Sequence, residues 1–339
     1  MSAGSDTVSG RRGMWEDFGH RFAAQRGLFL AIFIFVVMFA LFGWKNEIGL
    51  TSNIINTAAN KGVILALVAM AQTIPVLTGG IDLSVGMVFV LANCLGATIV
   101  NGDDFSTGLG VVAVLVTGLA CGTVNGLIVV FGRLQPIVVT IATSAIYFGL
   151  ALWLKPTPGG SVNGDFADFM TRSTFAVPHS IILVVLVVLV LWLPYRRSVV
   201  GRAAYAIGSS EQAAYMSGVP IARAKVTAYA LAGLLASIAG LLLTALTYTG
   251  EARAALGGDY TLNSIASVVI GGTSLFGGSG SAIGSIFGAF ILRTVGDLLF
   301  VFDVNPVLQP LFVGIVLLFA VSLGSVRLLR IKNKLDLYR

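Results

Sequence analysis

Five polar side chains stand out because they lie within or directly beside long apolar segments of the chain. They are Gln72, Asp82, Ser84, Asn93 and Asn125. If these segments cross a bilayer, amide and hydroxyl groups there either hydrogen-bond the hydroxyl groups of a polar solute or bond a neighbouring helix. Both interpretations stay open, and the five residues are the candidates for a translocation path or gate.

The segment Thr78–Gly86 (TGGIDLSVG) places a carboxylate between two apolar runs. A charge near the middle of a bilayer costs about 2.5–3.5 kcal/mol on insertion scales, so Asp82 is expected to have a partner or a function. Asp82 and Ser84 also suit the start of the next helix, where their oxygens can accept from free backbone N–H groups. Helix capping and a direct role in a solute path are the two alternatives.

A second charged pair lies within a later apolar run. Arg293 and Asp297 are four residues apart, so their side chains share one face of a helix. An unpaired charge at this position would be costly, and mutual neutralisation is the expected arrangement. A structural ion pair and a gate are the two alternatives.

Residues suited to catalysis or metal binding are scarce. The chain has two histidines, His20 and His179, and two cysteines, Cys94 and Cys121, both of which lie in apolar runs. We therefore expect no catalytic site, no metal site and no disulfide framework. The motif G-x-x-x-x-G-K-[ST] does not occur, so the chain itself is not expected to cradle ATP phosphates.

The composition indicates that membrane-spanning helices position these residues. The chain has 339 residues, of which 56% are apolar and 11% charged, whereas soluble proteins carry about 25% charged residues. The 41 glycines suit close helix packing in lipid. The net charge of +6 is not a nucleic-acid signal, because Lys and Arg gather on the cytoplasmic side of membrane proteins. The sequence predicts an all-α polytopic membrane protein.

Ten apolar runs are candidate spans, and the eighth is short enough to be a half-helix or a re-entrant segment. They cover residues 27–43, 61–78, 84–100, 109–131, 136–154, 179–194, 226–247, 260–271, 281–299 and 307–324. Of the 21 Lys and Arg residues, fifteen fall on the side predicted to be cytoplasmic, five on the opposite side and one, Arg293, within a span. This bias predicts that both termini are cytoplasmic.

The predicted organisation has three parts. A polar cytoplasmic segment at 1–26 precedes the transmembrane domain at 27–324, and a basic cytoplasmic tail follows at 325–339. The N-terminal polar stretch is too long for a cleaved signal peptide. Within the transmembrane domain, 155–180 is predicted to be an outer loop and 195–225 an inner loop.

Two glycine patterns bear on how the helices pack. The pattern G-G-x-x-L-x-x-G occurs at Gly79–Gly86 and again at Gly271–Gly278, each time after an apolar run. Duplicated breaks in transporters often lie near the binding site, although glycine is common enough here for chance to produce the echo. Small-x-x-x-small ladders at Gly118/Gly122/Gly126 and Gly280/Gly284/Gly288 favour helix packing.

The inner loop contains a short helix signature between Ala206 and Gly218. Ser209 or Ser210 can cap its start, and Gly218 can end it. A helix this short buries little apolar area by itself. Docking on a partner would account for it, whereas a surface helix lying on the lipid headgroups would need a stronger apolar face than the residues AAYM at 213–216 supply.

Three blocks of the sequence resemble the permease subunits of bacterial ABC sugar importers of the ribose, xylose, arabinose and galactoside class. They are TGGIDLSVG at 78–86, GRAAYAIGSSEQAAYMSGV at 201–219 and IASVVIGGTSLFGGSGSAIGSIFGAFI at 265–291. The resemblance implies an inward transporter of a monosaccharide, polyol or glycoside in the bacterial inner membrane. It also implies a second permease subunit, a cytoplasmic ATPase that carries the ATP and Mg²⁺, and a periplasmic sugar-binding protein.

The resemblance further implies that part of the inner loop contacts the ATPase. Gly208, Glu211, Ala214 and Gly218 correspond to a coupling helix that fits a groove on that subunit. The family usually has Gly-Gly-Asn where this chain has Gly208-Ser209-Ser210.

Two other classes of protein are alternatives. An ion-coupled secondary transporter of a small neutral solute would use intramembrane carboxylates, of which only Asp82 and Asp297 are available. A membrane-embedded enzyme would need a nucleophile and base or a metal cluster, which the scarcity of His and Cys disfavours.

Overall fold

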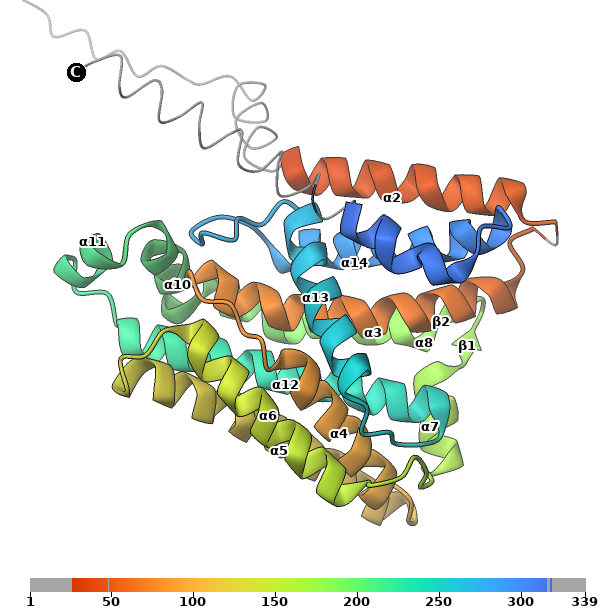
Figure 1. Ribbon diagram of the computed structural model, residues 1–339, viewed down its shortest axis with the longest axis horizontal. Coiled ribbons are helices and arrows are strands. Elements are labelled where there is room, and N and C mark those ends of the chain that lie inside the picture. The colour runs from red at the N-terminus through yellow and green to blue at the C-terminus, as the bar shows by residue number, and fades with distance from the viewer. Residues whose placement is uncertain (1–25, 48, 316–317, 319–339) are drawn as a thin grey trace, which may run out of the picture.

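The computed structural model describes residues 26–47, 49–315 and 318. Most of this part of the chain is helical, as Figure 1 shows. The elements, in chain order, are α2 (Arg26–Lys45), α3 (Ser52–Leu77), α4 (Val85–Ile99), α5 (Asp104–Phe131), α6 (Pro136–Leu154), α7 (Gly164–Thr171), β1 (Ser173–Thr174), β2 (Val177–Pro178), α8 (His179–Val187), the π-helical turn η1 (Val188–Trp192), α9 (Leu193–Arg197), α10 (Val199–Ser209), α11 (Glu211–Met216), α12 (Ile221–Thr247), α13 (Ala254–Ile270), α14 (Ala282–Val301) and the 3-10 turn η2 (Pro306–Leu308).

Seven described helical segments are long and apolar enough to cross a membrane. They are Gly27–Lys45, Ser52–Leu77, Asp104–Phe131, Pro136–Leu154, His179–Arg197, Ile221–Thr247 and Ala282–Val301. Helix α4 has 15 residues and α13 has 17, so each is shorter than a full span. The structure therefore supports a polytopic all-α membrane protein.

Several predicted segments differ from the structure or extend beyond the described residues. The eighth run begins earlier than predicted, at Ala254 instead of residue 260. The first turns of α3, from Ser52, are also helical although the predicted run starts at 61. Residues 316–317 and 319–324 of the tenth run, the tail at 325–339 and residues 1–25 lie outside the described residues.

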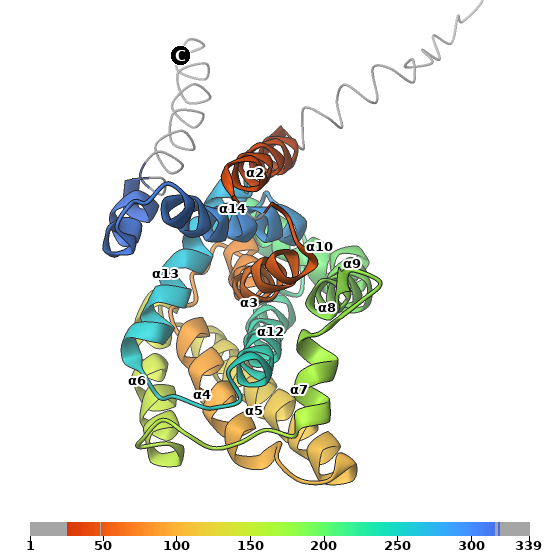
Figure 2. The ribbon, with the colours of Figure 1, turned by 90° about the vertical axis from the view of Figure 1, so that its right-hand side faces the viewer.

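Helices α3 and α12 form the centre of the molecule. In the end-on view of Figure 2 they lie between the α2–α14 pair and the group formed by α4, α5 and α6. Every residue of α3 from Gly62 to Leu77 is buried. The apolar core runs along this buried half, and the side chains that face lipid lie on the outer helices, for example Phe33 of α2 and Val138 of α6, which are exposed.

Small residues allow the central helices to approach closely, as the glycine ladders predict. A Cβ on Gly118 would meet the carbonyl oxygen of Gly233 at 2.5 Å, and one on Gly122 would meet the backbone of Tyr229. Gly284 packs in the same way against Gly271. Gly280 precedes the start of α14 at Ala282, so it is not part of a helical ladder.

The two polar loops of the sequence have their own secondary structure. The loop at 155–180 contains α7 and an antiparallel pair, β1 and β2, in which Ser173 faces Pro178 and Thr174 faces Val177. The loop at 195–225 contains α10 and α11 and the flanking turns of α9 and α12.

Candidate translocation path and coupling loop

The stretch between α3 and α4 is non-helical, and the side-chain amide of Gln72 stabilises it. With the amide oriented so that both of its polar atoms are paired, its nitrogen donates to the carbonyl oxygen of Asp82 (2.7 Å) and its oxygen accepts from the Asp82 N–H (3.2 Å). Gln72 is fully buried and Asp82 is 2% exposed. Non-helical backbone between membrane helices needs such partners, because lipid offers no hydrogen bonds.

The carboxylate of Asp82 belongs to a buried chain of hydrogen bonds. Its Oδ1 accepts from the backbone N–H of Ser84 (2.9 Å) and from the Ser84 hydroxyl (2.6 Å). The Nδ2 of Asn125 donates to the Ser84 Oγ (2.7 Å), and the hydroxyl of Tyr147 lies 3.0 Å from the Asn125 Oδ1. Four of the five predicted path residues therefore meet around this break.

The predicted capping role of Ser84 is only partly realised. Ser84 is the residue that precedes α4, but its side chain makes no cap bond to that helix. Its hydroxyl instead donates to Asp82, and it is Asp82 that accepts from a backbone N–H. The Asp82 side chain thus takes the hydroxyl that could otherwise cap α4.

Two threonines that are not among the predicted path residues accept hydrogen bonds from backbone N–H groups in and beside this stretch. The hydroxyl of Thr140 in α6 accepts from the Leu83 N–H (3.0 Å), and that of Thr261 in α13 accepts from the Gly86 N–H (3.1 Å). Threonines inside apolar helices are the available sequence signal, but their hydroxyls usually bond their own helix, as Thr140 also does to Pro136.

Asn93 holds a second non-helical stretch, at 248–253 between α12 and α13. Its Nδ2 donates to the Thr249 carbonyl oxygen (3.1 Å) and to the Thr244 hydroxyl (3.0 Å), and its Oδ1 accepts from the Glu251 N–H (3.0 Å). Asn93 thus does for this stretch what Gln72 does for the first one. These bonds favour the helix-bonding interpretation of the polar residues, and their role along a solute path stays a prediction.

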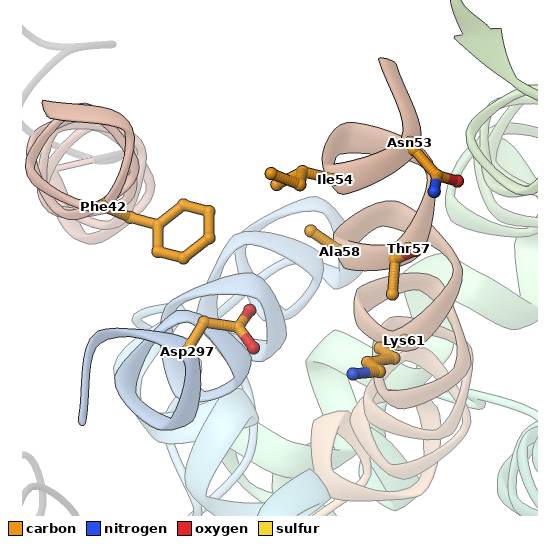
Figure 3. Close-up of a pocket in the computed structure, with 7 residues that line it drawn as sticks. All are labelled: Phe42, Asn53, Ile54, Thr57, Ala58, Lys61 and Asp297. Atoms are coloured by element: carbon orange, nitrogen blue, oxygen red, sulfur yellow. The ribbon is translucent and has the colours of Figure 1, made fainter. Parts of the chain in front are cut away.

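The predicted contact between Arg293 and Asp297 is not formed. The ion pairs within 4.0 Å in the described part of the chain join Arg172 to Asp168, Lys225 to Glu211 and Arg253 to Glu251. Asp297 instead lines a cavity of about 180 Å³ together with Lys61 of α3. Figure 3 shows both charged groups turned toward this space. The four-residue spacing of Arg293 and Asp297 on α14 could not show that Lys61 of another helix lines the same cavity as Asp297.

The short inner-loop helix forms as predicted. Ser210 precedes α11, and its hydroxyl accepts from the Ala213 N–H (3.3 Å). Gly218 has φ of +73°, and the N–H groups of Gly218 and Val219 donate to the carbonyl oxygens of Tyr215 and Ala214. This is the glycine-ended helix terminus in which two otherwise free carbonyl groups are paired.

The side chains of this loop face in two directions. Ala214 is 4% exposed and packs in a small apolar cluster with Ala203, Ile207 and Ala224. Glu211 is paired with Lys225 (2.7 Å).

The outward face of α11 carries two large side chains. Tyr215 is 76% and Met216 87% exposed, and both line a shallow groove of about 430 Å³ with Gln212, Glu211 and Ile221. The helix therefore presents more apolar surface than its sequence suggested, and this surface lies beside, not on, the predicted Gly208 and Ala214 positions.

Comparisons with known proteins agree along most of the chain. A family model described as "Branched-chain amino acid transport system / permease component" matches residues 54–321. The ribose import permease protein of Bacillus subtilis is 36% identical over 301 residues, which cover 88% of this chain and 91% of that protein. A probable ABC transporter permease protein of Sinorhizobium fredii is 35% identical over 267 residues, covering 77% and 78%.

A third relative is similar over a comparable length. The D-allose transport system permease protein of Escherichia coli is 32% identical over 296 residues, covering 86% of this chain and 89% of that protein. No solved structure matches the chain.

Proposed function

Because this chain belongs to the family of permease components described for branched-chain amino acid transport systems, we propose that it is the membrane subunit of an ATP-driven importer for a small sugar. It is a multi-pass protein of the bacterial inner membrane and a transport component. The observation that carries the sugar assignment is the 36% identity to a ribose import permease over 88% of the chain. The related allose permease supports a monosaccharide more broadly.

The proposed topology has ten spans with both termini in the cytoplasm. The charge bias of fifteen to five among Lys and Arg supports it. On this topology 155–180 faces the periplasm and 195–225 the cytoplasm. Residues 1–26 and 325–339 are then cytoplasmic segments that flank the transmembrane domain at 27–324.

The transporter is proposed to work as an assembly. A cytoplasmic ATPase binds ATP and Mg²⁺, a periplasmic binding protein delivers the sugar, and a second permease subunit completes the path. The exposed Tyr215 and Met216 support α11 as the ATPase contact, because a docking surface needs large side chains with free apolar area. Gly208, Glu211, Ala214 and Gly218 then shape and orient this helix within the coupling loop.

The path is proposed to carry a neutral solute. The described intramembrane carboxylates, Asp82 and Asp297, face Ser84 and the Lys61 cavity respectively. A sugar needs hydrogen-bonding groups and no counter-charge. The ion-coupled alternative has no support among the named relatives, one of which is called an ABC transporter permease.

Reconstitution tests this function. The chain is placed in vesicles with the ATPase and the binding protein encoded beside it, and ribose and allose uptake are measured with ATP inside and a proton ionophore present. We expect uptake that needs ATP and the binding protein and survives the ionophore. Uptake abolished by the ionophore would contradict the proposal.

A further inference from the structure

Three glycines from distant parts of the chain meet where α10 ends. Gly79 follows α3, Gly208 lies in the last turn of α10, and Gly277 lies in the loop between α13 and α14. A Cβ on Gly277 would lie 2.8 Å from the Gly79 nitrogen and 2.9 Å from the Gly208 Cα. A Cβ on Gly277 or on Gly208 would therefore clash with neighbouring backbone atoms, whereas Gly79 is favoured by its positive φ of +80°.

Gly208 contacts two non-helical segments, which we call the two breaks: residues 78–84 between α3 and α4, and residues 271–281 between α13 and α14. A Cβ on Gly208 would meet the Leu77 carbonyl oxygen at the end of α3 and the Gly278 nitrogen in the loop between α13 and α14. These two atoms are themselves hydrogen-bonded, because the Gly278 N–H donates to the Leu77 oxygen (3.1 Å). The last turn of α10 therefore packs against the hydrogen bond between Gly278 and Leu77, which joins the two breaks.

A second contact ties α10 to the same loop. The Tyr205 hydroxyl, one turn before Ser209, donates to the Gly280 carbonyl oxygen (2.9 Å). Burial raises the pKa of the Tyr205 phenol, so this hydroxyl keeps its proton and remains a donor.

The helices that precede the two breaks, α3 and α13, end in the same way. Gly79 after α3 has φ of +80° and Gly272 after α13 has φ of +82°. In each case the glycine N–H donates to the carbonyl three residues back, and the next N–H donates to the carbonyl five residues back. The structural match pairs Gly79 with Gly272, one residue away from the pairing in the sequence echo. Gly218 after α11 has the same two bonds, so this common helix terminus does not by itself establish the repeat suggested by the sequence echo.

We propose that Gly208 is a positioning residue through which the inner loop moves both membrane breaks together. The proposal rests on the proposed function, since it describes how a movement imposed on α11 reaches the transmembrane helices. Helix α11 follows α10 directly at Ser210. A displacement of α11 therefore shifts Gly208, and the close backbone packing at Gly208 passes this shift to the end of α3 and to the loop between α13 and α14. The first of these breaks contains Asp82 and the buried network around it.

Gly208→Ala tests the proposal with a minimal change. Gly208 is helical, and alanine favours a helix more than glycine does, so α10 itself is not weakened. The added methyl group forces the three backbones apart. Gly149→Ala is the matched control, because Gly149 lies in helix α6 and a Cβ there meets nothing within 4 Å. Tyr205→Phe is a milder variant that removes only the bond to Gly280.

The readouts are co-purification of the ATPase and stimulation of ATP hydrolysis by the sugar-loaded binding protein. We expect Gly208→Ala to retain the ATPase but to lose stimulation by about 5- to 150-fold, the usual range of coupling between sites. Tyr205→Phe should lose less, and Gly149→Ala should behave as the unaltered protein. If Gly208→Ala does not accumulate in the membrane, reduced stimulation in Tyr205→Phe with the ATPase still bound carries the proposal.

Three results would overturn the inference. The first is unchanged stimulation of ATP hydrolysis in Gly208→Ala or, if that variant does not accumulate, in Tyr205→Phe. The second is loss of the ATPase from Gly208→Ala, which would make Gly208 a docking contact. The third is a loss of stimulation in Gly149→Ala equal to that in Gly208→Ala. Failure of the proposed function is distinct, because the unaltered complex would then show no stimulation by any sugar-loaded binding protein.

Discussion

The side-chain amide of Gln72 pairs with both backbone polar atoms of Asp82, a residue ten positions later and beyond the end of α3. An amide is suited to this because it carries one acceptor and one donor group at the spacing of a peptide. The non-helical segment between α3 and α4 is therefore fixed from within the molecule. Asn93 pairs with the backbone of Thr249 and Glu251 in the same way.

Replacing the Gln72 amide should destabilise the protein. Gln72→Leu leaves the Asp82 N–H and carbonyl group buried without partners, and each costs about 1–3 kcal/mol. The apparent melting temperature in detergent should fall clearly. Gln135→Leu is the control, because Gln135 is exposed and makes no side-chain cap bond. Equal melting temperatures for the two variants would contradict the role of Gln72.

Asn125→Ala distinguishes a structural role from a path role. It removes the bond to Ser84 and one of the two acceptors of the Tyr147 hydroxyl, which still donates to the Cys121 carbonyl oxygen. We expect a loss of stability of about 0.5–1.5 kcal/mol per bond, with an unchanged maximal uptake rate per folded complex. Normal thermal stability together with a reduced uptake rate would instead place Asn125 on the path.

The positive φ of Gly218 should be required for ATPase binding. A β-branched residue there is strained by about 1–2 kcal/mol or more, whereas asparagine adopts this conformation more readily. We expect Gly218→Val to insert in the membrane but to lose co-purification with the ATPase, and Gly218→Asn to retain most of it. Because a Cβ at this site meets nothing within 4 Å, steric clash does not confuse the comparison. Similar ATPase yields from both variants would contradict the argument.

Asp297 should be coupled to two cations, Arg293 of its own helix and Lys61 of α3. Double-mutant cycles with Lys61→Gln, Arg293→Gln and Asp297→Asn measure the two couplings from unfolding in detergent. Lys61 is exposed and Asp297 partly so, and we expect a coupling of about 0.2–1 kcal/mol with each cation, the one with Arg293 being at least as large as the one with Lys61. Zero coupling between Asp297 and both cations would contradict this arrangement.

Cysteine labelling checks the proposed topology. In a background without Cys94 and Cys121, Ser161→Cys should react with a membrane-impermeant reagent from outside the cell. Gln212→Cys should react only after the membrane is opened. Both positions are exposed, so access depends on the side of the membrane. Labelling of both from the same side would rule out the ten-span arrangement.

Hydropathy located the helices well because crossing a bilayer requires a long apolar run whatever the neighbours are. The run predicted at 136–154 coincides with α6, and that at 27–43 lies within α2. The start of α12 at Ile221 was missed by five residues, since its first turns carry Arg223 and Lys225 and reduce the local hydropathy. Local signals also identified Ser210 and Gly218 as the ends of α11, because caps depend on neighbouring residues alone.

By itself, then, the amino-acid sequence determined the membrane class, the positions of most spans, the short helix α11 and the set of buried polar residues. Only the tertiary structure decided what those residues touch. Asn93 and Glu251 are 158 positions apart, and Gly277 meets Gly79 and Gly208 only after α3, α10 and the α13–α14 loop have packed. Polar groups in lipid must find partners, but the sequence does not specify which one lies within 3 Å, because that depends on how the helices pack.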